Sequence, residues 1–467
     1  MTERPVPEPS TVGPEPAPGR SVERVLHNAS LTLATRGATS LLRLIRNVIL
    51  ARLLGPFERG ALNALFALIE TLIYVSGFGL AMAAQKEAAN AEDPHRGNLV
   101  LLVLATAIGL IIAALTFGAL STGVLFAGAE QALKPFAAMF AIMAFMMFMR
   151  NIGHAQLVGG ERIARSNAFR LVEAVLLIVL VLILVIVFEK DLTAVSFGFF
   201  VGYGVVFFLV YRSLFAGGVT RPEGRWPRAL TQVMKSGLRS YPDDVALSVV
   251  FRADLLFLAA LKGAETAAFY AIALVGTEVL ATVSESVASA AAKSLLTQRE
   301  GERAPDKQTF AMVRLTLYGA VPGAVILSLL SPLWVGGLFG QDYLPATVAV
   351  PWLAAAVAAA SVLAFIRLSL IGKGYPGLVS LVASVSAVAS LLLNLLLIPP
   401  FGMVGAAIAS LITYVGMTGV NAVHLAYRAK ISPIRYFWDP ETDRAIARAV
   451  IARMKGMREG RQSPQET

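Results

Sequence analysis

The chain alternates long apolar runs with short segments that are polar or rich in proline and glycine. About twelve of these runs reach the ~20 residues that an α-helix needs to cross a bilayer. The pattern predicts an all-α integral membrane protein with about twelve transmembrane helices in two six-helix lobes. The expected spans are 28–51, 60–84, 97–126, 133–157, 165–188, 192–216, 229–261, 264–292, 309–338, 344–371, 376–398 and 402–428.

The segments outside the spans differ in character. The N-terminal tail is rich in Pro, Glu and Gly and lacks the apolar core of a signal peptide, so we expect it to be disordered and cytoplasmic. Near the other end, Ile446, Val450, Met454 and Met457 form an apolar stripe between arginines and lysines. This stripe predicts a basic amphipathic helix on the inner membrane surface, with a solvated tail as the alternative. The expected organisation is an N-terminal tail over 1–27, an N-lobe over 28–216, a cytoplasmic linker over 217–228, a C-lobe over 229–428 and a basic tail over 429–467.

The two halves show weak similarity to each other. Halves in the same orientation are related by an axis along the membrane normal, a design found in several transporters. When the two halves are aligned with each other, Arg36 matches Asp244 and Arg46 matches Asp254, so one half carries cations where the other carries carboxylates. The positions that match are Ala51, Leu53, Gly55, Glu70, Leu72, Val75 and Ser76 with Ala259, Leu261, Gly263, Glu278, Leu280, Val283 and Ser284.

Composition and charge agree with a membrane protein. Hydrophobic residues make up 56% of the chain and charged residues 15%, whereas about 25% of residues are charged in soluble domains. A net charge of +10 would suggest nucleic acid in a soluble protein, but here it follows from Lys- and Arg-rich loops on one side of the membrane. These loops and both termini are expected to be cytoplasmic by the positive-inside rule, and no nucleic-acid partner is expected.

The first span carries a stripe of arginines. One narrow helical face holds Arg36, Thr39, Ser40, Arg43 and Asn47, and Arg46 lies beside it. A charge at bilayer depth costs roughly 2.5–3.5 kcal/mol on insertion scales unless it faces water, a partner or a substrate. Because a guanidinium donates two parallel hydrogen bonds to phosphate, the stripe predicts a cationic wall for a phosphate-bearing substrate. The alternative is that Arg36 extends to the cytoplasmic surface and the others form structural ion pairs.

The seventh span combines basic and acidic residues around a proline, Pro242, which permits a bend. We interpret these charges as a cavity wall or gate, with carboxylates able to bind a proton or Na⁺. The alternative is that the carboxylates neutralise the arginines of the first span. The charged residues of this span are Arg239, Asp243, Asp244, Arg252 and Asp254.

Four further charged residues lie inside expected spans: Glu70 in the second, Glu278 and Glu285 in the eighth, and Arg367 in the tenth. Buried carboxylates take up protons near neutral pH unless they are paired. The three glutamates are therefore candidates for ion coupling, with ion pairs at packing interfaces as the alternative. Arg367 is a candidate for substrate binding.

Other chemistry has little support in the sequence. Near the cytoplasmic ends of the fourth and fifth spans lie Arg150, Arg170 and Glu173, which we expect to form an inner gate or a structural salt bridge and not a substrate site. The sequence contains no cysteine and no phosphate-binding loop, and the four histidines lack metal-ligand spacing. No cofactor and no enzymatic activity are therefore expected.

Several stretches together resemble a known family. The seventh span has Pro242 with Arg252-Ala253-Asp254, followed by Gly263 and Tyr270, and it accompanies three loose motifs that occur in the family's order. The motifs are Arg52-Leu53-Leu54-Gly55-Pro56 followed by Gly60 and the segment through Gly77-Phe78-Gly79; Leu338-Phe339-Gly340-Gln341-Asp342-Tyr343 with Pro345-Ala346; and Asn394 to Pro399 followed by Gly402, Gly405-Ala406-Ala407 and Ala409-Ser410. The order and spacing resemble the polysaccharide transporters of the Wzx-type flippase family. That family belongs to a superfamily that also contains the MATE multidrug exporters and the MurJ flippases.

The resemblance implies two six-helix lobes, alternating access and a specific cargo. The cargo would be an oligosaccharide linked through pyrophosphate to undecaprenyl, flipped across the bacterial cytoplasmic membrane for surface polysaccharide biosynthesis. Expected partners are this lipid-linked oligosaccharide, membrane lipid and the polysaccharide polymerase machinery. The resemblance also implies a cationic cavity, for which the candidates are Arg36, Arg43, Arg46, Arg239, Arg252 and Arg367.

Three other functions fit parts of the pattern. A MATE-type antiporter for drugs or metabolites would use Asp243, Asp254 or Glu278 to bind a cation, although the arginines of the first span would repel a cationic substrate. A membrane glycosyl polymerase or ligase generally needs a large outer loop, which the sequence lacks. A structural role in a polysaccharide assembly complex could use the basic tail.

Overall fold

The computed structural model describes residues 18–91, 93, 96–123, 130–188, 192–220, 226–239, 241–296 and 307–429. The amphipathic helix expected near the C-terminus lies outside these residues, and so does the N-terminal tail as far as residue 17. Helix α1 already begins at Pro18, within the segment that the sequence predicted to be disordered.

The described chain is almost entirely helical. The first half contains α1 (Pro18–Leu53), α2 (Pro56–Ser76), α3 (Leu80–Ala89), α4 (Leu99–Thr122), α5 (Glu130–Leu133), α6 (Ala137–Gly159), α7 (Ile163–Phe188) and α8 (Leu192–Phe215). The second half contains α9 (Trp226–Leu238), α10 (Tyr241–Lys262), α11 (Ala264–Leu296), α12 (Lys307–Leu329), α13 (Ser331–Trp334), α14 (Val350–Gly372) and α15 (Pro376–Ala429). Two short strands, β1 (Gly97–Asn98) and β2 (Val219–Thr220), pair in parallel.

The prediction of about twelve spans is confirmed. In the described residues nine helices are long and apolar enough to cross a membrane. One of them, α15, consists of two helices joined at Gly402, whose φ of 58° and ψ of −132° interrupt the helical geometry. Helices α1 and α10 are also long enough, but their charged residues make them too polar to be recognised by hydropathy. When α1 and α10 are included and α15 is counted as two helices, the described residues contain twelve spans.

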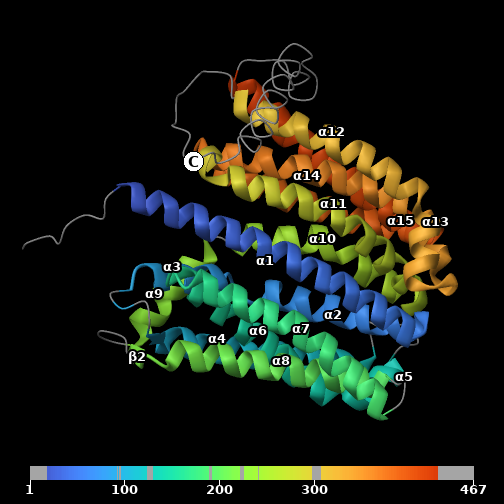
Figure 1. Cartoon of the computed structure of the whole chain (residues 1–467), viewed down its shortest axis with the longest axis horizontal. Helices are drawn as coiled ribbons and strands as arrows, with labels where there is room; N and C mark the ends of the chain where they lie inside the picture. Colours follow the sequence, from blue (N-terminus) through green and yellow to red (C-terminus); the bar gives the residue numbers. More distant parts are fainter. Residues whose placement is uncertain are drawn as a thin grey trace, which may run out of the picture.

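The helices form two lobes with α1 between them (Figure 1). The N-lobe is built from α2, α3, α4, α6, α7 and α8, and the C-lobe from α10, α11, α12, α14 and α15. Helix α1 packs against α7 on one side and against α11 on the other. Helices α3 and α9 lie at one end of the molecule, here called the α9 end, and α5 and α13 lie at the opposite α13 end (Figure 1).

Three expected spans are divided in the structure: 60–84, 229–261 and 309–338, the last of which breaks at Leu330 between α12 and α13. The span 60–84 breaks between α2 and α3, where Gly79 adopts a φ of 67° that strongly favours glycine. The span 229–261 is two helices, because α9 ends at Leu238 and Pro242 lies in the first turn of α10. Proline is well tolerated in a first turn, since the amide it lacks would have no intrahelical partner there. Pro242 therefore begins a helix and does not bend one.

The lobes are joined most tightly at the α13 end. A single hydrophobic core there includes Leu54 and Leu62 from the first two helices together with Tyr270, Phe339 and Tyr343 from the second half. Toward the other end, the C-lobe has two separate core clusters of its own. The hydrophobic core that the lobes share lies at the α13 end of the described structure, and near the α2–α3 break the lobes also meet through the rings of Phe78 and Tyr241, whose centroids lie 5.5 Å apart.

The closest approach at this end depends on Gly60. A Cβ atom placed on this residue would lie 1.7 Å from the carbonyl oxygen of Ala264, which begins α11. Only glycine allows the two helices to cross at this separation.

Gly60→Ala should therefore destabilise the protein by about 1–3 kcal/mol, the usual cost of overpacking. Thermal unfolding of the purified protein in detergent measures the effect. Gly55→Ala is the matched control, because Gly55 has ordinary φ and ψ values and a Cβ there would meet nothing within 4 Å. Equal melting temperatures for the two variants would contradict the prediction.

Candidate functional site

Charged side chains from four helices meet between the lobes. This interlobe charged cluster consists of Arg43 and Arg46 on α1, Glu70 on α2, Arg252 on α10 and Glu278 on α11. Nη2 of Arg252 lies 2.8 Å from Oε2 of Glu70, so this ion pair joins the C-lobe to the N-lobe. The two side chains remain 45% and 32% exposed. The pair therefore lies at an accessible surface although both helices belong to the membrane-spanning bundle.

Arg43 and Glu278 extend the accessible part of the cluster. Both side chains are exposed. Nη2 of Arg43 donates to Oγ of Ser40 at 3.2 Å, which orients the guanidinium along α1. Glu278 lies within electrostatic reach of the three arginines and of Glu70. The cluster thus combines three cations with two carboxylates in one accessible region.

Arg46 occupies a more enclosed position. Its guanidinium carbon lies 5.5 Å from the centroid of the Phe199 ring, at the distance of a cation–π contact. Its Nε has no hydrogen-bond partner among the described residues. The neighbouring Asn47 has a structural task, because its Oδ1 accepts a 2.7 Å hydrogen bond from the buried Arg59. The predicted polar stripe on α1 is therefore partly structural and partly accessible.

The cationic surface continues from α1 onto α7. Arg36 is exposed, and so is Arg170, which lies within electrostatic reach of both Arg36 and Arg43. Like charges at this separation repel each other in the empty protein. Such a surface is suited to an anion that would be shared between the two helices.

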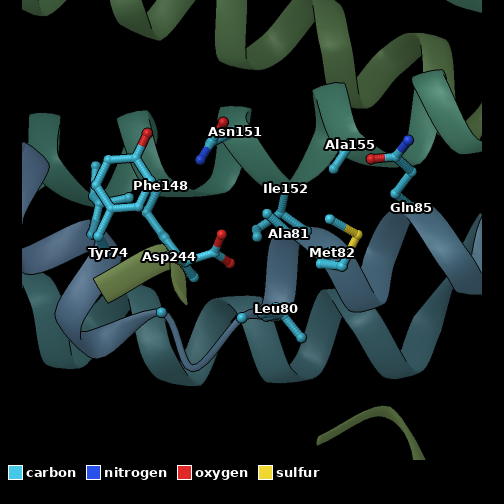
Figure 2. A pocket seen from close by; sticks show the side chains of 13 residues that line it. Tyr74, Leu80, Ala81, Met82, Gln85, Phe148, Asn151, Ile152, Ala155 and Asp244 are labelled. Carbon is cyan, nitrogen blue, oxygen red and sulfur yellow. The ribbon is translucent and has the colours of Figure 1, made fainter. Parts of the chain in front are cut away.

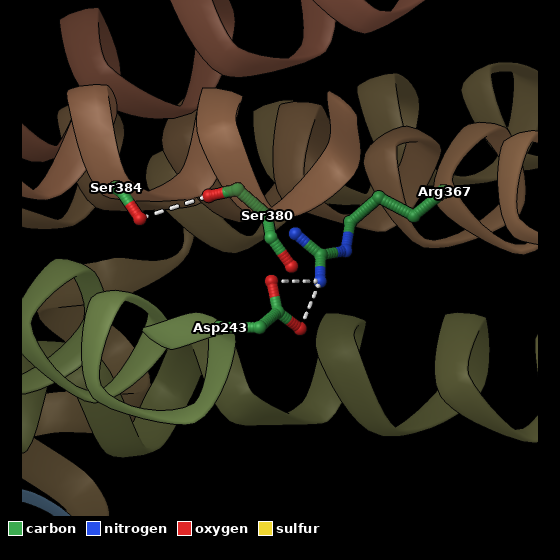
Figure 3. A network of polar contacts seen from close by, with 4 residues as sticks. All are labelled: Asp243, Arg367, Ser380 and Ser384. Carbon is green, nitrogen blue, oxygen red and sulfur yellow. Dashed lines mark hydrogen bonds and ion pairs between the residues drawn. The ribbon is translucent and has the colours of Figure 1, made fainter. Parts of the chain in front are cut away.

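Arg367 lies within the C-lobe and not in the cluster. Its Nη2 donates to both carboxylate oxygens of Asp243, at 3.0 and 2.8 Å (Figure 3). Only 12% of the Arg367 side chain is exposed. The ion pair connects α14 to the first turn of α10, so these two candidates hold the C-lobe together in this conformation.

Asp254 is buried in the C-lobe. It is 2% exposed and accepts hydrogen bonds from three donors: the amide of Leu255 at 2.7 Å, the hydroxyl of Ser410 at 3.1 Å, and the hydroxyl of Tyr270. The donors come from α10, α11 and α15. A carboxylate held in this way is kept away from a large substrate.

Asp244 faces a different space from its neighbour Asp243. It lines a pocket of about 230 Å³ between α2, α3 and α6 (Figure 2). The pocket also includes the side chains of Tyr74, Gln85 and Asn151. Asp244 is thus the one C-lobe residue in a pocket that is otherwise built from the N-lobe.

Arg239 lies outside the cluster, at the α9 end. It lines a pocket of about 740 Å³ between α3 and α9, together with Lys86, Arg228 and Lys235. Glu285 belongs to α11, but its side chain is not among those that the structure describes.

The predicted contact between Arg150 and Glu173 is a salt bridge inside the N-lobe. The two side chains are only 17% and 18% exposed. The Arg150 guanidinium also lies 5.1 Å from the centroid of the Tyr203 ring. This pair connects α6 to α7 and has a structural role in the observed conformation.

Sequence reasoning missed the polar partners of the charged candidates. Tyr270 and Ser410 hold Asp254, and Arg59 holds Asn47. Gln85 and Asn151 line the pocket beside Asp244. Polar residues within apolar spans were the available signal, but their partners are distant in the sequence.

Comparison with known proteins identifies the family. The family model described as "Polysaccharide biosynthesis protein" matches residues 25–296. No curated protein matches the chain.

Several solved structures have a fold similar to that of this chain. A structure of the lipid II flippase MurJ in an inward closed conformation has a TM-score of 0.69 and 14% identity, covering 87% of this chain and 89% of the other. An inward-facing MATE multidrug transporter of the MOP superfamily has a TM-score of 0.67 and 15% identity, covering 86% and 99%. A MOP superfamily transporter from Pyrococcus furiosus, described as having a binding pocket of reverse polarity, has a TM-score of 0.57 and 14% identity, covering 87% and 95%.

At such low identities the solved structures establish the fold alone, whereas the family model spans more than half of the chain. The chain therefore belongs to the polysaccharide biosynthesis protein family, and it has the two-lobe membrane fold of the MOP superfamily transporters.

Proposed function

We propose that the protein flips an undecaprenyl-pyrophosphate-linked oligosaccharide across the bacterial cytoplasmic membrane by alternating access. The observation that carries this proposal is the interlobe charged cluster, in which Arg43 of α1 and Arg252 of the C-lobe remain accessible between the lobes. Family membership supports a role in polysaccharide biosynthesis. A polysaccharide polymerase would use the exported lipid on the outer side.

The cargo presents a physical problem that this cluster can solve. A pyrophosphate and sugar hydroxyls cannot enter hydrocarbon without losing their hydrogen bonds to water. Guanidinium groups of Arg43 and Arg252 can replace that water with charge-assisted hydrogen bonds. The polyprenyl chain can stay in lipid if it leaves through the opening between the lobes.

The observed contacts support a state that is closed at the α13 end. Arg52, at the end of α1, donates to the main-chain carbonyls of Gly337 and Leu338, and Tyr343 donates to the carbonyl of Leu54 at 3.1 Å. The two inward conformations above have TM-scores of 0.69 and 0.67, and an outward-facing MATE structure has 0.62. With the N-terminus cytoplasmic, the α13 end would face outward, and export would require these contacts to break.

Arg43→Ala and Arg46→Ala together should abolish surface polysaccharide while the protein still inserts in the membrane. Each lost charge-assisted hydrogen bond reduces binding by about 10- to 100-fold. Surface polysaccharide is measured on cells that carry the variant as their only copy, with protein in the membrane fraction quantified in parallel. Arg212→Ala is the control, because Arg212 is exposed in the last turn of α8 and lies outside the cluster. Wild-type export by the double variant would refute the assigned role.

We also propose that export is coupled to an ion through Asp254. A proton or Na⁺ bound at this buried carboxylate would change its hydrogen bonds to α11 and α15. A change at this point can reach the cluster, because Arg252 lies on the same helix.

Flipping of fluorescent lipid-linked oligosaccharide in vesicles should therefore stop when the ion gradient is collapsed by a protonophore or by a sodium ionophore. Asp254→Asn should stop gradient-driven flipping but leave lipid binding intact. Continued flipping without either gradient would remove the coupling role and leave the flippase assignment in place.

A MATE-type exporter of organic cations is the second candidate, favoured by the exposed carboxylates Glu70 and Glu278. It predicts gradient-dependent efflux of a fluorescent organic cation such as ethidium. The flippase assignment predicts no such efflux, because Arg43, Arg46 and Arg252 leave the cluster with more positive than negative groups.

A further inference from the structure

The small pocket in Figure 2 lies where the break between α2 and α3 meets α6 and the first turn of α10. Its polar side chains are Tyr74, Gln85, Asn151 and Asp244. Asp244 comes from the C-lobe and the other three come from the N-lobe. The pocket therefore depends on the relative position of the lobes.

The four polar side chains are not used by the fold. None of them forms a hydrogen bond or an ion pair with another residue in the part of the chain that the structure describes. The adjacent Asp243, in contrast, is held by Arg367. A partly buried pocket with four unpaired polar groups retains its hydrogen-bonding capacity for a ligand.

The chemistry of these groups matches sugar hydroxyls. The amides of Gln85 and Asn151 and the hydroxyl of Tyr74 both donate and accept hydrogen bonds, and the Asp244 carboxylate accepts them. A sugar hydroxyl also donates and accepts. The Tyr74 side chain is 44% exposed, so its ring can pack against the apolar C–H face of a pyranose. The carboxylate makes the same pocket unfavourable for a phosphate.

The volume and the position of the pocket restrict further which ligand can bind there. A volume of about 230 Å³ is below the roughly 300–1,000 Å³ of pockets for larger ligands, so one sugar ring fits and an oligosaccharide does not. Tyr74 lies one helical turn beyond Glu70, and it is within electrostatic reach of Glu70, Arg252 and Asp244. The pocket thus adjoins the interlobe charged cluster.

We propose that this pocket binds the first sugar residue of the cargo, the one attached to pyrophosphate. The inference rests on the proposed function, in which the pyrophosphate is bound by the adjacent arginines. Because Asp244 and the other three polar residues belong to different lobes, movement of the lobes changes the pocket. Affinity for the sugar therefore differs between the two conformations, which favours release on the opposite side.

Binding of defined lipids to the purified full-length protein, measured by native mass spectrometry, tests the proposal. The probes are undecaprenyl pyrophosphate and the same lipid carrying either N-acetylglucosamine or galactose. The wild-type protein should bind at least one sugar-bearing lipid about tenfold more tightly than the sugar-free lipid. Asp244→Asn and Asn151→Ala should bring this ratio close to one without weakening sugar-free binding.

Gln85→Ala is a third pocket variant, which changes an exposed residue and should lower the ratio in a stably folded protein. Two controls, Asp243→Asn and Arg43→Ala, separate the sugar contact from folding and from the pyrophosphate site. Asp243→Asn alters the neighbouring carboxylate, so it should lower the melting temperature but keep the ratio. Arg43→Ala should weaken binding of all the lipids equally.

The outcomes distinguish this inference from the function on which it rests. Equal binding of all the lipids by the wild-type protein, or an unchanged ratio in all three pocket variants, would overturn the sugar-binding assignment alone. If none of the lipids binds, the proposed function is overturned as well. Ethidium binding that requires Asp244, without preference among the lipids, would assign the pocket to organic cations.

Discussion

The ion pair between Arg252 and Glu70 stabilises charged side chains at the junction where the two lobes face each other. A lone guanidinium in hydrocarbon is costly, whereas one that is paired and hydrated is tolerated. Figure 1 shows α1 running along the same junction between lobes, so its arginines share this environment. The accessible charges of α1, α2, α10 and α11 gather at this junction, whereas the pairs Arg367–Asp243 and Arg150–Glu173 are enclosed within a lobe.

The mixture of positive and negative side chains in the cluster affects how readily a bound anion would be released. Three arginines alone would bind a pyrophosphate tightly, and a transporter that binds too tightly cannot release its cargo. Glu70 and Glu278 offset part of the positive field, and Glu70 already occupies one face of Arg252. Under the proposed function, an arriving phosphate would compete with this carboxylate for the guanidinium. The net attraction would be reduced, and the displaced ion pair would form again as the cargo leaves.

The sequence predicted the architecture well because a membrane span is a local property. Length and hydropathy located nearly all the helices, and charge inside a span correctly indicated where polar contacts must lie. The pairing of charged side chains, in contrast, is not a local property of the sequence. Asp243 and Asp244 are adjacent on α10, yet the first binds Arg367 within the C-lobe and the second faces an N-lobe pocket. Helical periodicity places these two carboxylates on different faces but cannot name their partners, which are distant in the sequence, and the break before Tyr241 removes Arg239 from the face predicted for Asp243 and Asp254.

The contact of Arg52 with Gly337 and Leu338 has an evolutionary consequence. Its acceptors are main-chain carbonyls, which every amino acid supplies. Substitutions at residues 337 and 338 can therefore accumulate in relatives without weakening these hydrogen bonds from Arg52, provided that the local backbone conformation is kept. Correlated substitutions, which reveal many contacts between distant positions, would leave no trace of this one.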